Sequence, residues 1–214
     1  MEKVAKLVHM DCERMGGVPG EFPYWLDPDR KAITTHGSDA VAASRLVDLI
    51  LYGELGLSFD ASRLEMRPAK NSRLKWLSAQ RFHVGCYGSF FLGREGERVY
   101  SATTFQRLES RDALKFTNCE KVPSNPALEC LHFFGPTQLL CAGNTSSSNV
   151  STSVSIPLKD NLLSRSLFAG IEELEPETGR WNLSEKVRSS EKLSVRVSLN
   201  PNSWKMLRVS QITT

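Results

Sequence analysis

A stretch near the C-terminus alternates between apolar and polar residues. Its apolar members are Leu193, Val195, Val197 and Leu199, and its polar members are Ser194, Arg196 and Ser198. Successive side chains of a β-strand point to opposite faces, so the alternation predicts a strand with one face in a core and one in solvent. An Asn-Pro-Asn-Ser turn at 200–203 and a second strand at 204–209 follow. We expect residues 192–212 to form an amphipathic β-hairpin, with a bulge where Met206 and Leu207 interrupt the alternation.

Short apolar runs separated by Gly, Pro, Asn and Ser recur before this stretch. They predict strands at 55–59, 74–77, 82–87, 90–92, 98–103, 128–134, 138–142, 150–156, 193–199 and 204–209. Many short strands at close spacing favour an antiparallel sandwich or barrel. Between them we expect short helices at 104–114 and 162–174, an exposed mobile loop at 143–149 and an acidic surface loop at 172–180.

The N-terminal quarter has helical periodicity. Residues 2–15 carry an apolar stripe that ends at Gly16-Gly17, and a proline-rich connector covers 18–30. Ser38 is a suitable N-cap for a second helix whose apolar face runs to Leu51. We therefore expect a mainly β (α+β) protein, in which a helical segment, residues 1–53, packs on a β-rich domain, residues 54–214.

Composition excludes several classes of protein. No apolar stretch approaches the length of a membrane span, and the chain begins without a signal-peptide pattern. The five cysteines are odd in number and lack a Cys-x-x-Cys pair, which favours reduced thiols in an intracellular compartment, the cytoplasm or nucleus. Cys119, Cys130 and Cys141 are spaced too widely for a metal-ligand loop. We expect no metal and no cofactor.

Positive residues gather in two stretches, although the net charge is only +3. The first comprises Arg63, Arg67, Lys70, Arg73, Lys75 and Arg81, with Trp76 and Phe82 as aromatic support; the second comprises Lys192, Arg196, Lys205 and Arg208. Cations neutralise phosphates, and aromatic rings stack on bases or lie at a lipid interface. The alternatives are an ordinary solvated face and, for the second stretch, protection of an edge strand from aggregation. The sequence leaves open whether the two stretches converge.

Two histidines lie in apolar, strand-like runs. His83 and His132 would suit a two-histidine phosphoesterase if they faced one cleft, with one acting as base and the other as acid. Such enzymes carry Ser or Thr two residues after each histidine, and here those positions are Gly85 and Phe134. Two buried, hydrogen-bonded histidines are the favoured interpretation.

We therefore predict a non-catalytic binding or assembly protein whose basic surface contacts an anionic partner, either RNA or an acidic lipid surface. A self-assembling structural protein, such as a viral matrix or coat protein, is the first alternative, and it would form a homo-oligomer. A motif-poor enzyme that uses His83 and His132 for phosphoester hydrolysis is the second.

Overall fold

A computed structural model describes residues 26–27, 32–33, 52–53, 56–60, 63–67, 74–83, 87–106, 108–109, 113–135, 137–158 and 168–211. The chain divides into two compact units, Met1–Leu57 and Ser58–Thr214. In the first unit, β1 (Leu26–Asp27) pairs with β2 (Ala32–Ile33). The helices predicted at 2–15 and from Ser38 to Leu51 lie outside the described residues.

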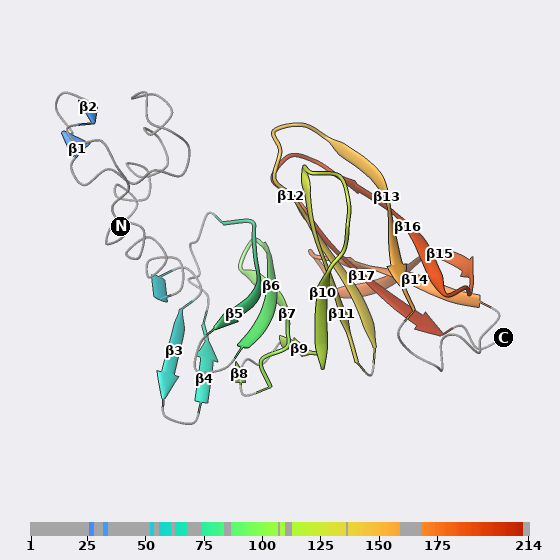
Figure 1. The fold of residues 1–214 in the computed structure, drawn as a ribbon, viewed down its shortest axis with the longest axis horizontal. Coiled ribbons are helices and arrows are strands. Elements are labelled where there is room, and N and C mark those ends of the chain that lie inside the picture. Colours follow the sequence, from blue (N-terminus) through green and yellow to red (C-terminus); the bar gives the residue numbers. More distant parts are fainter. Residues whose placement is uncertain are drawn as a thin grey trace. The chain divides into compact units, whose positions relative to one another are not determined.

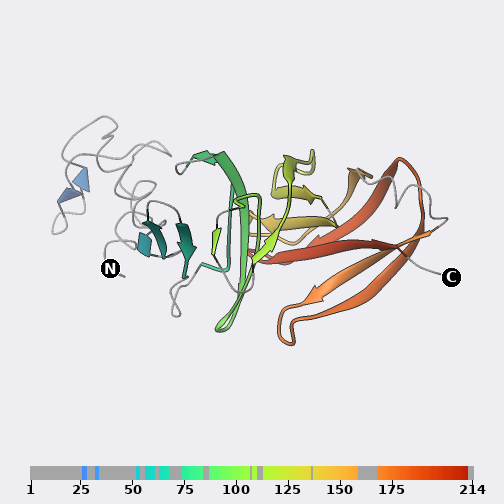
Figure 2. The same cartoon turned by 90° about the horizontal axis from the view of Figure 1, so that it is seen from below.

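A six-stranded antiparallel sheet, here called the central sheet, organises the second unit. Its strands follow the order β10-β11-β12-β17-β14-β15. Their bounds are β10 Asn118–Lys121, β11 Leu128–Phe134, β12 Gln138–Asn144, β14 Phe168–Glu175, β15 Arg180–Arg188 and β17 Trp204–Gln211. Figure 2 shows the β14–β15 hairpin in orange. The prediction of a mainly β chain with antiparallel sheets is confirmed.

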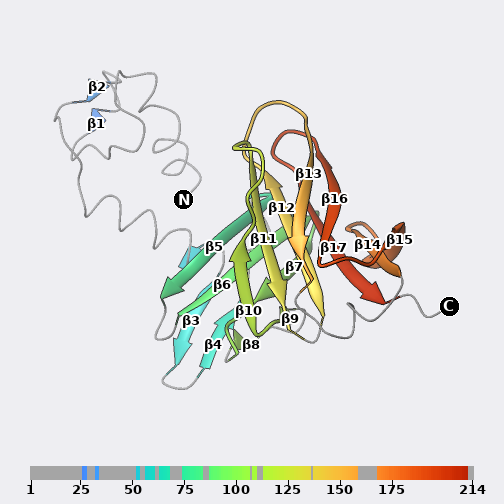
Figure 3. The ribbon, with the colours of Figure 1, turned by 45° about the vertical axis from the view of Figure 1, so that its right-hand side comes forward.

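The remaining strands form three further sheets. β13 (Val150–Pro157) pairs antiparallel with β16 (Lys192–Leu199), and the two lie side by side in Figures 1 and 3. The third sheet has the order β5 (Trp76–His83), β6 (Tyr87–Glu95), β7 (Arg98–Thr103) and β9 (Ala113–Lys115). A small sheet joins β3 (Leu57–Asp60), β4 (Arg63–Met66) and β8 (Leu108–Glu109). The β7–β9 and β4–β8 pairs are parallel.

Two apolar cores lie on opposite faces of the central sheet. In the first core, Val195 of β16 and Val154 of β13 pack with Leu207 of β17. In the second core, Phe91 of β6 packs with Met206 of β17. Because neighbouring residues of one strand point to opposite faces, the central sheet is the middle layer between β13–β16 and the β5–β6–β7–β9 sheet.

The expected hairpin at 192–212 is wrong, although both of its strands are present. β16 pairs with β13, whereas β17 pairs with β12 and β14, so the turn at 200–203 carries the chain from one sheet to another. The expected bulge is also wrong, because the register between β12 and β17 is continuous. Met206 and Leu207 are both apolar because each face of β17 contacts a core. The register shift lies instead between Ile171 and Glu172.

Three other local predictions fail. The helix expected at 104–114 is replaced by strands β8 and β9, and the described part of the helix expected at 162–174 belongs to β14. The expected acidic loop at 172–180 begins inside β14, which runs to Glu175. Each segment contributes to a sheet, because pairing with neighbouring strands outweighs local helical or loop preference.

Two tryptophans connect the central sheet to the β5–β6–β7–β9 sheet. A Cβ atom added to Gly143 of β12 would lie 2.5 Å from the Trp76 ring, and one added to Gly93 of β6 would lie 2.4 Å from the Trp204 ring. Each indole therefore rests directly on the backbone of the facing sheet. The Trp204 Nε1–H also donates to the Arg94 carbonyl at 2.9 Å, so its only polar atom has a partner inside the core.

We predict that Gly143→Ala lowers the free energy of unfolding by about 1–3 kcal/mol, because the new methyl group overlaps the Trp76 ring. Urea unfolding of Gly143→Ala, Trp76→Ala and the double variant measures this. The glycine substitution should cost much less in the Trp76→Ala background, since the ring it meets is gone. An equal cost in both backgrounds would show that the ring contact is not its cause.

Candidate functional site

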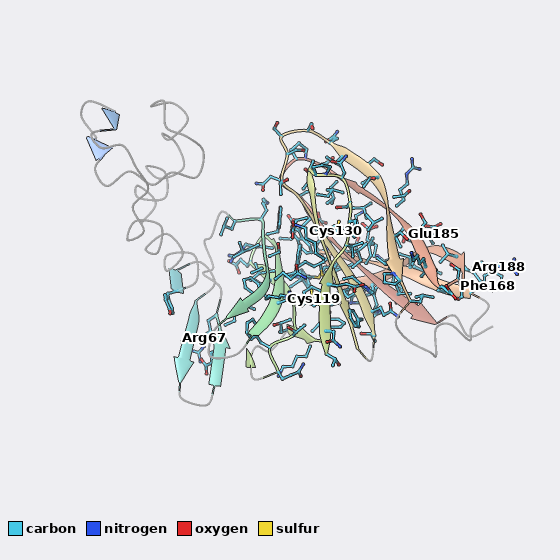
Figure 4. All side chains as sticks on the ribbon, viewed as in Figure 1. Arg67, Cys119, Cys130, Phe168, Glu185 and Arg188 are labelled. Atoms are coloured by element: carbon cyan, nitrogen blue, oxygen red, sulfur yellow. The ribbon has the colours of Figure 1, made fainter. Side chains whose placement is uncertain are left out.

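The first basic stretch is dispersed. Arg67 forms an ion pair with Glu65 at 2.8 Å, and exposed Lys75 and Arg81 lie towards opposite ends of β5. Figure 4 labels Arg67 beside β4. The side chains of Arg63 and Phe82, and residues Lys70 and Arg73 altogether, lie outside what the structure describes.

The side chain of Trp76 is half-buried and packs against the second core. Its ring stacks on Phe91 with the centroids 6.0 Å apart and the planes inclined by 8°, and it also covers Gly143. Both contacts belong to the core between two sheets. The predicted role of Trp76 as a surface for bases or lipid therefore gains no support from its position.

Half of the second basic stretch is neutralised by carboxylates of β14. Lys205 Nζ lies 2.8 Å from Glu173, and Arg208 Nε lies 2.9 Å from Glu172. The Arg208 guanidinium also lies over the Trp181 ring, 4.7 Å from its centroid. These two cations are structural links between neighbouring strands β17 and β14.

Four of the described cations lie on opposite sides of the central sheet. Lys75 and Arg81 belong to the layer on one side of the central sheet, and Lys192 and Arg196 belong to β16 on the other side. The middle layer separates them. A single surface that combines β5 with β16 is therefore excluded for these four residues.

The outward face of the β13–β16 sheet carries an ordered set of polar side chains. Register pairs Ser151 with Ser198, Ser153 with Arg196, Ser155 with Ser194 and Pro157 with Lys192. All the serines, Arg196 and Lys192 are exposed, and neither strand contains an acidic residue. Ser151 and Ser198 share a hydrogen bond of 2.7 Å between their Oγ atoms. We call these residues the serine face.

A hollow of about 470 Å³ opens where the serine face meets the turn at 200–203. Its polar lining consists of Asn149, Ser151, Ser198, Asn200, Ser203 and Lys205. Val150, Leu199 and Trp204 complete the lining, but their side chains are buried in the two cores. The hollow has the size of a small-molecule site.

Buried Asn144 holds the two loops beside the hollow together. Its Nδ2 donates to the carbonyls of Ser148 and Asn200 at 2.8 and 2.9 Å. Its Oδ1 accepts from the backbone N–H and the hydroxyl of Ser146 at 2.9 and 2.8 Å. The expectation of a wholly exposed loop at 143–149 is therefore wrong at Asn144, which is 0% exposed and fixes the loop to the turn after β16.

His132 is sealed inside the second unit. Its Nδ1 lies 3.4 Å from Glu120 Oε1 and its Nε2 lies 3.1 Å from Gln138 Oε1, while its ring packs on Phe134. It is 0% exposed, so substrate does not reach it in this conformation. The side chain of His83 lies outside the described residues.

The three described cysteines are free thiols in the central sheet, and Cys119 and Cys130 are labelled in Figure 4. Burial raises the pKa of the Cys119 thiol to about 12. Burial likewise raises the pKa of Cys130, and it raises that of Cys141 well above the ordinary value. Since the thiolate is the nucleophile, we expect these groups to react slowly in the folded chain.

Among the described residues, no group of three or more His, Cys, Asp or Glu side chains has an arrangement that holds a metal ion. Within that same part of the chain, no helix has the length and apolar character needed to cross a membrane.

No family model matches this chain, and no curated protein does. Three solved structures show distant likeness. A β-arabinopyranosidase has 14% identity over 47% of this chain and 15% of its own, with a TM-score of 0.31. A GH27 β-L-arabinopyranosidase from Geobacillus stearothermophilus, in complex with arabinose, has 16% identity over 45% and 20%, with a TM-score of 0.31. A putative α-galactosidase from Bacteroides fragilis has 13% identity over 45% and 19%, with a TM-score of 0.29.

The chain thus spans no more than 20% of the length of these three proteins. The candidate sites stand on their own geometry.

We predict that Asn144→Ala lowers the free energy of unfolding by about 2–3 kcal/mol, since it removes several hydrogen bonds of a fully buried side chain. Urea unfolding measures the loss, and hydrogen exchange should accelerate at the Ser146 amide. Exposed Asn149→Ala is the matched control and should change stability by less than about 0.5 kcal/mol. Equal effects of the two substitutions would contradict the role of Asn144.

Thiol labelling tests the sealed core. In a Cys12→Ser, Cys86→Ser background, Cys119, Cys130 and Cys141 remain. With a pKa of about 12, about one Cys119 in ten thousand is thiolate at pH 8, so a disulfide reagent should react slowly with the folded chain. All three thiols should react in concentrated guanidinium chloride, which is the control. Rapid labelling of the folded chain would show that the thiols are accessible.

Proposed function

We propose that this chain is a non-catalytic binding module and that its serine face contacts the phosphates of an RNA backbone. The main support is the position of Arg196, which is exposed and surrounded by serine hydroxyls on β13 and β16. Neither strand contains an acidic residue. Lys192 extends the positive charge along the same face of β16. Elsewhere in the described part of the two stretches, Arg67, Lys205 and Arg208 are engaged with carboxylates.

The chemistry of the face favours phosphate contact. A guanidinium donates two parallel hydrogen bonds to phosphate oxygens, and a serine hydroxyl donates one. The face displays no aromatic ring for base stacking, so we expect contacts to the RNA backbone that do not depend on the RNA sequence. Lipid is the weaker candidate, because an interfacial site needs apolar side chains that insert, and the apolar residues of both strands point into the core.

The serine face carries fewer cations than the sequence suggested, so we expect only a modest affinity for RNA. Two cations on one face give a log–log salt slope of roughly −1.4 for a single strand. The affinity should therefore be weak and should fall gently with salt.

Fluorescence anisotropy with a labelled single-stranded RNA oligonucleotide tests the proposal. Arg196→Ala should flatten the salt slope by about 0.7, because one phosphate contact is lost. Arg180→Ala removes the same charge from exposed β15 and is the matched control, which should leave the slope unchanged. An affinity that is independent of salt, or equal losses in both variants, would overturn the assignment to this face. Binding to phosphatidylserine vesicles without binding to RNA would show that the partner of the serine face is lipid and not RNA.

A further inference from the structure

The hollow beside the serine face differs from that face in its charge. Its one cationic side chain, Lys205, is held at 2.8 Å by Glu173, so the charge is balanced within the protein. The other polar groups in the wall are hydroxyls and side-chain amides. An anion would therefore find little net attraction here, in contrast to Arg196 on the open face.

The wall offers donors and acceptors in close proximity. An amide presents both an N–H₂ group and a carbonyl oxygen, and a hydroxyl both donates and accepts. Among the described residues, no hydrogen-bond partner occupies the side-chain amides of Asn149 and Asn200, and both residues are exposed. A ligand that carries only acceptors would leave the amide carbonyls unused, whereas a ligand hydroxyl matches either kind of group.

The wall is also fixed before any ligand arrives. Asn200 presents its carbonyl to Asn144 Nδ2 at 2.9 Å and to the Ser203 hydroxyl at 2.8 Å. The Ser203 N–H also donates to the same carbonyl at 3.3 Å. Several hydrogen bonds to one carbonyl therefore hold the backbone of the turn. The backbone of the turn then has little conformational entropy left to lose on binding.

We propose that the hollow binds a small neutral polyhydroxylated molecule, with the chemistry of a saccharide. Asn149 and Asn200 bond its hydroxyl groups, and the hydroxyls of Ser151 and Ser198 line the same hollow. This site uses the amides beside the turn and not Arg196, although it shares Ser151 and Ser198 with the serine face.

Saturation-transfer NMR on the full chain tests the site, with the methyl glycosides of glucose, galactose and mannose as probes. At least one glycoside should bind the wild type, and titration should give a dissociation constant about fivefold higher in Asn200→Ala and in Asn149→Ala, because each loses hydrogen bonds to the ligand. Asn182→Ala removes an exposed amide from β15, away from the hollow and the serine face; it is the matched control and should bind as the wild type does.

Inorganic phosphate serves as the charged competitor and should not displace the glycoside. Unfolding midpoints in urea establish that the variants are folded, which their exposed side chains lead us to expect. The proposal is overturned if none of the three glycosides binds, if neither asparagine substitution weakens binding, or if phosphate displaces the glycoside. Loss of RNA binding in Arg196→Ala with unchanged glycoside binding would show that the two sites are separate.

Discussion

The contact of each tryptophan with a glycine on the facing sheet sets the spacing of the layers in the second unit. Trp76 covers Gly143 and Trp204 covers Gly93, so each indole fills the space that a side chain would otherwise take. Phe91 lies beside both rings, with centroid distances of 6.0 Å to Trp76 and 6.5 Å to Trp204. Since close-packed interiors tolerate little change in volume, the sheets meet in only one arrangement around these rings. That arrangement places β17 between two cores.

Periodicity predicted the strands but not their partners. The strand expected at 128–134 coincides with β11, and those expected at 150–156 and 193–199 lie within β13 and β16. Turn chemistry at 200–203 specifies that the chain reverses, and it does so equally well within a sheet or between two sheets. The adjacent apolar residues Met206 and Leu207 indicate that β17 is buried on both faces, because such a strand loses the alternation of apolar and polar residues.

The candidate sites were less predictable, because charge in a sequence does not show which charges are paired. The sequence predicts a surface loop at Glu172 and Glu173. In the structure these carboxylates form ion pairs with Arg208 and Lys205 of the neighbouring strand. The hollow depends on contacts between residues far apart in the chain, of which the 2.9 Å bond from Asn144 to the Asn200 carbonyl is the clearest. The only local signal was the gathering of Asn and Ser at 144–149 and 200–203, and such residues are common in any turn.

The change of sheet after β16 explains why the serine face and the hollow are neighbours. A hairpin would have placed β17 beside β16, and the outward residues of the two strands would have shared one surface. Because β17 instead enters the central sheet, beside β14, Lys205 forms an ion pair with Glu173 of that strand. Arg196 and Lys192 of β16 therefore remain on a face of hydroxyls, and the corner left between the two sheets is lined mainly by uncharged groups. The passage of the chain from one sheet to another at 200–203 thus accounts for a positively charged face beside a hollow whose charge is balanced.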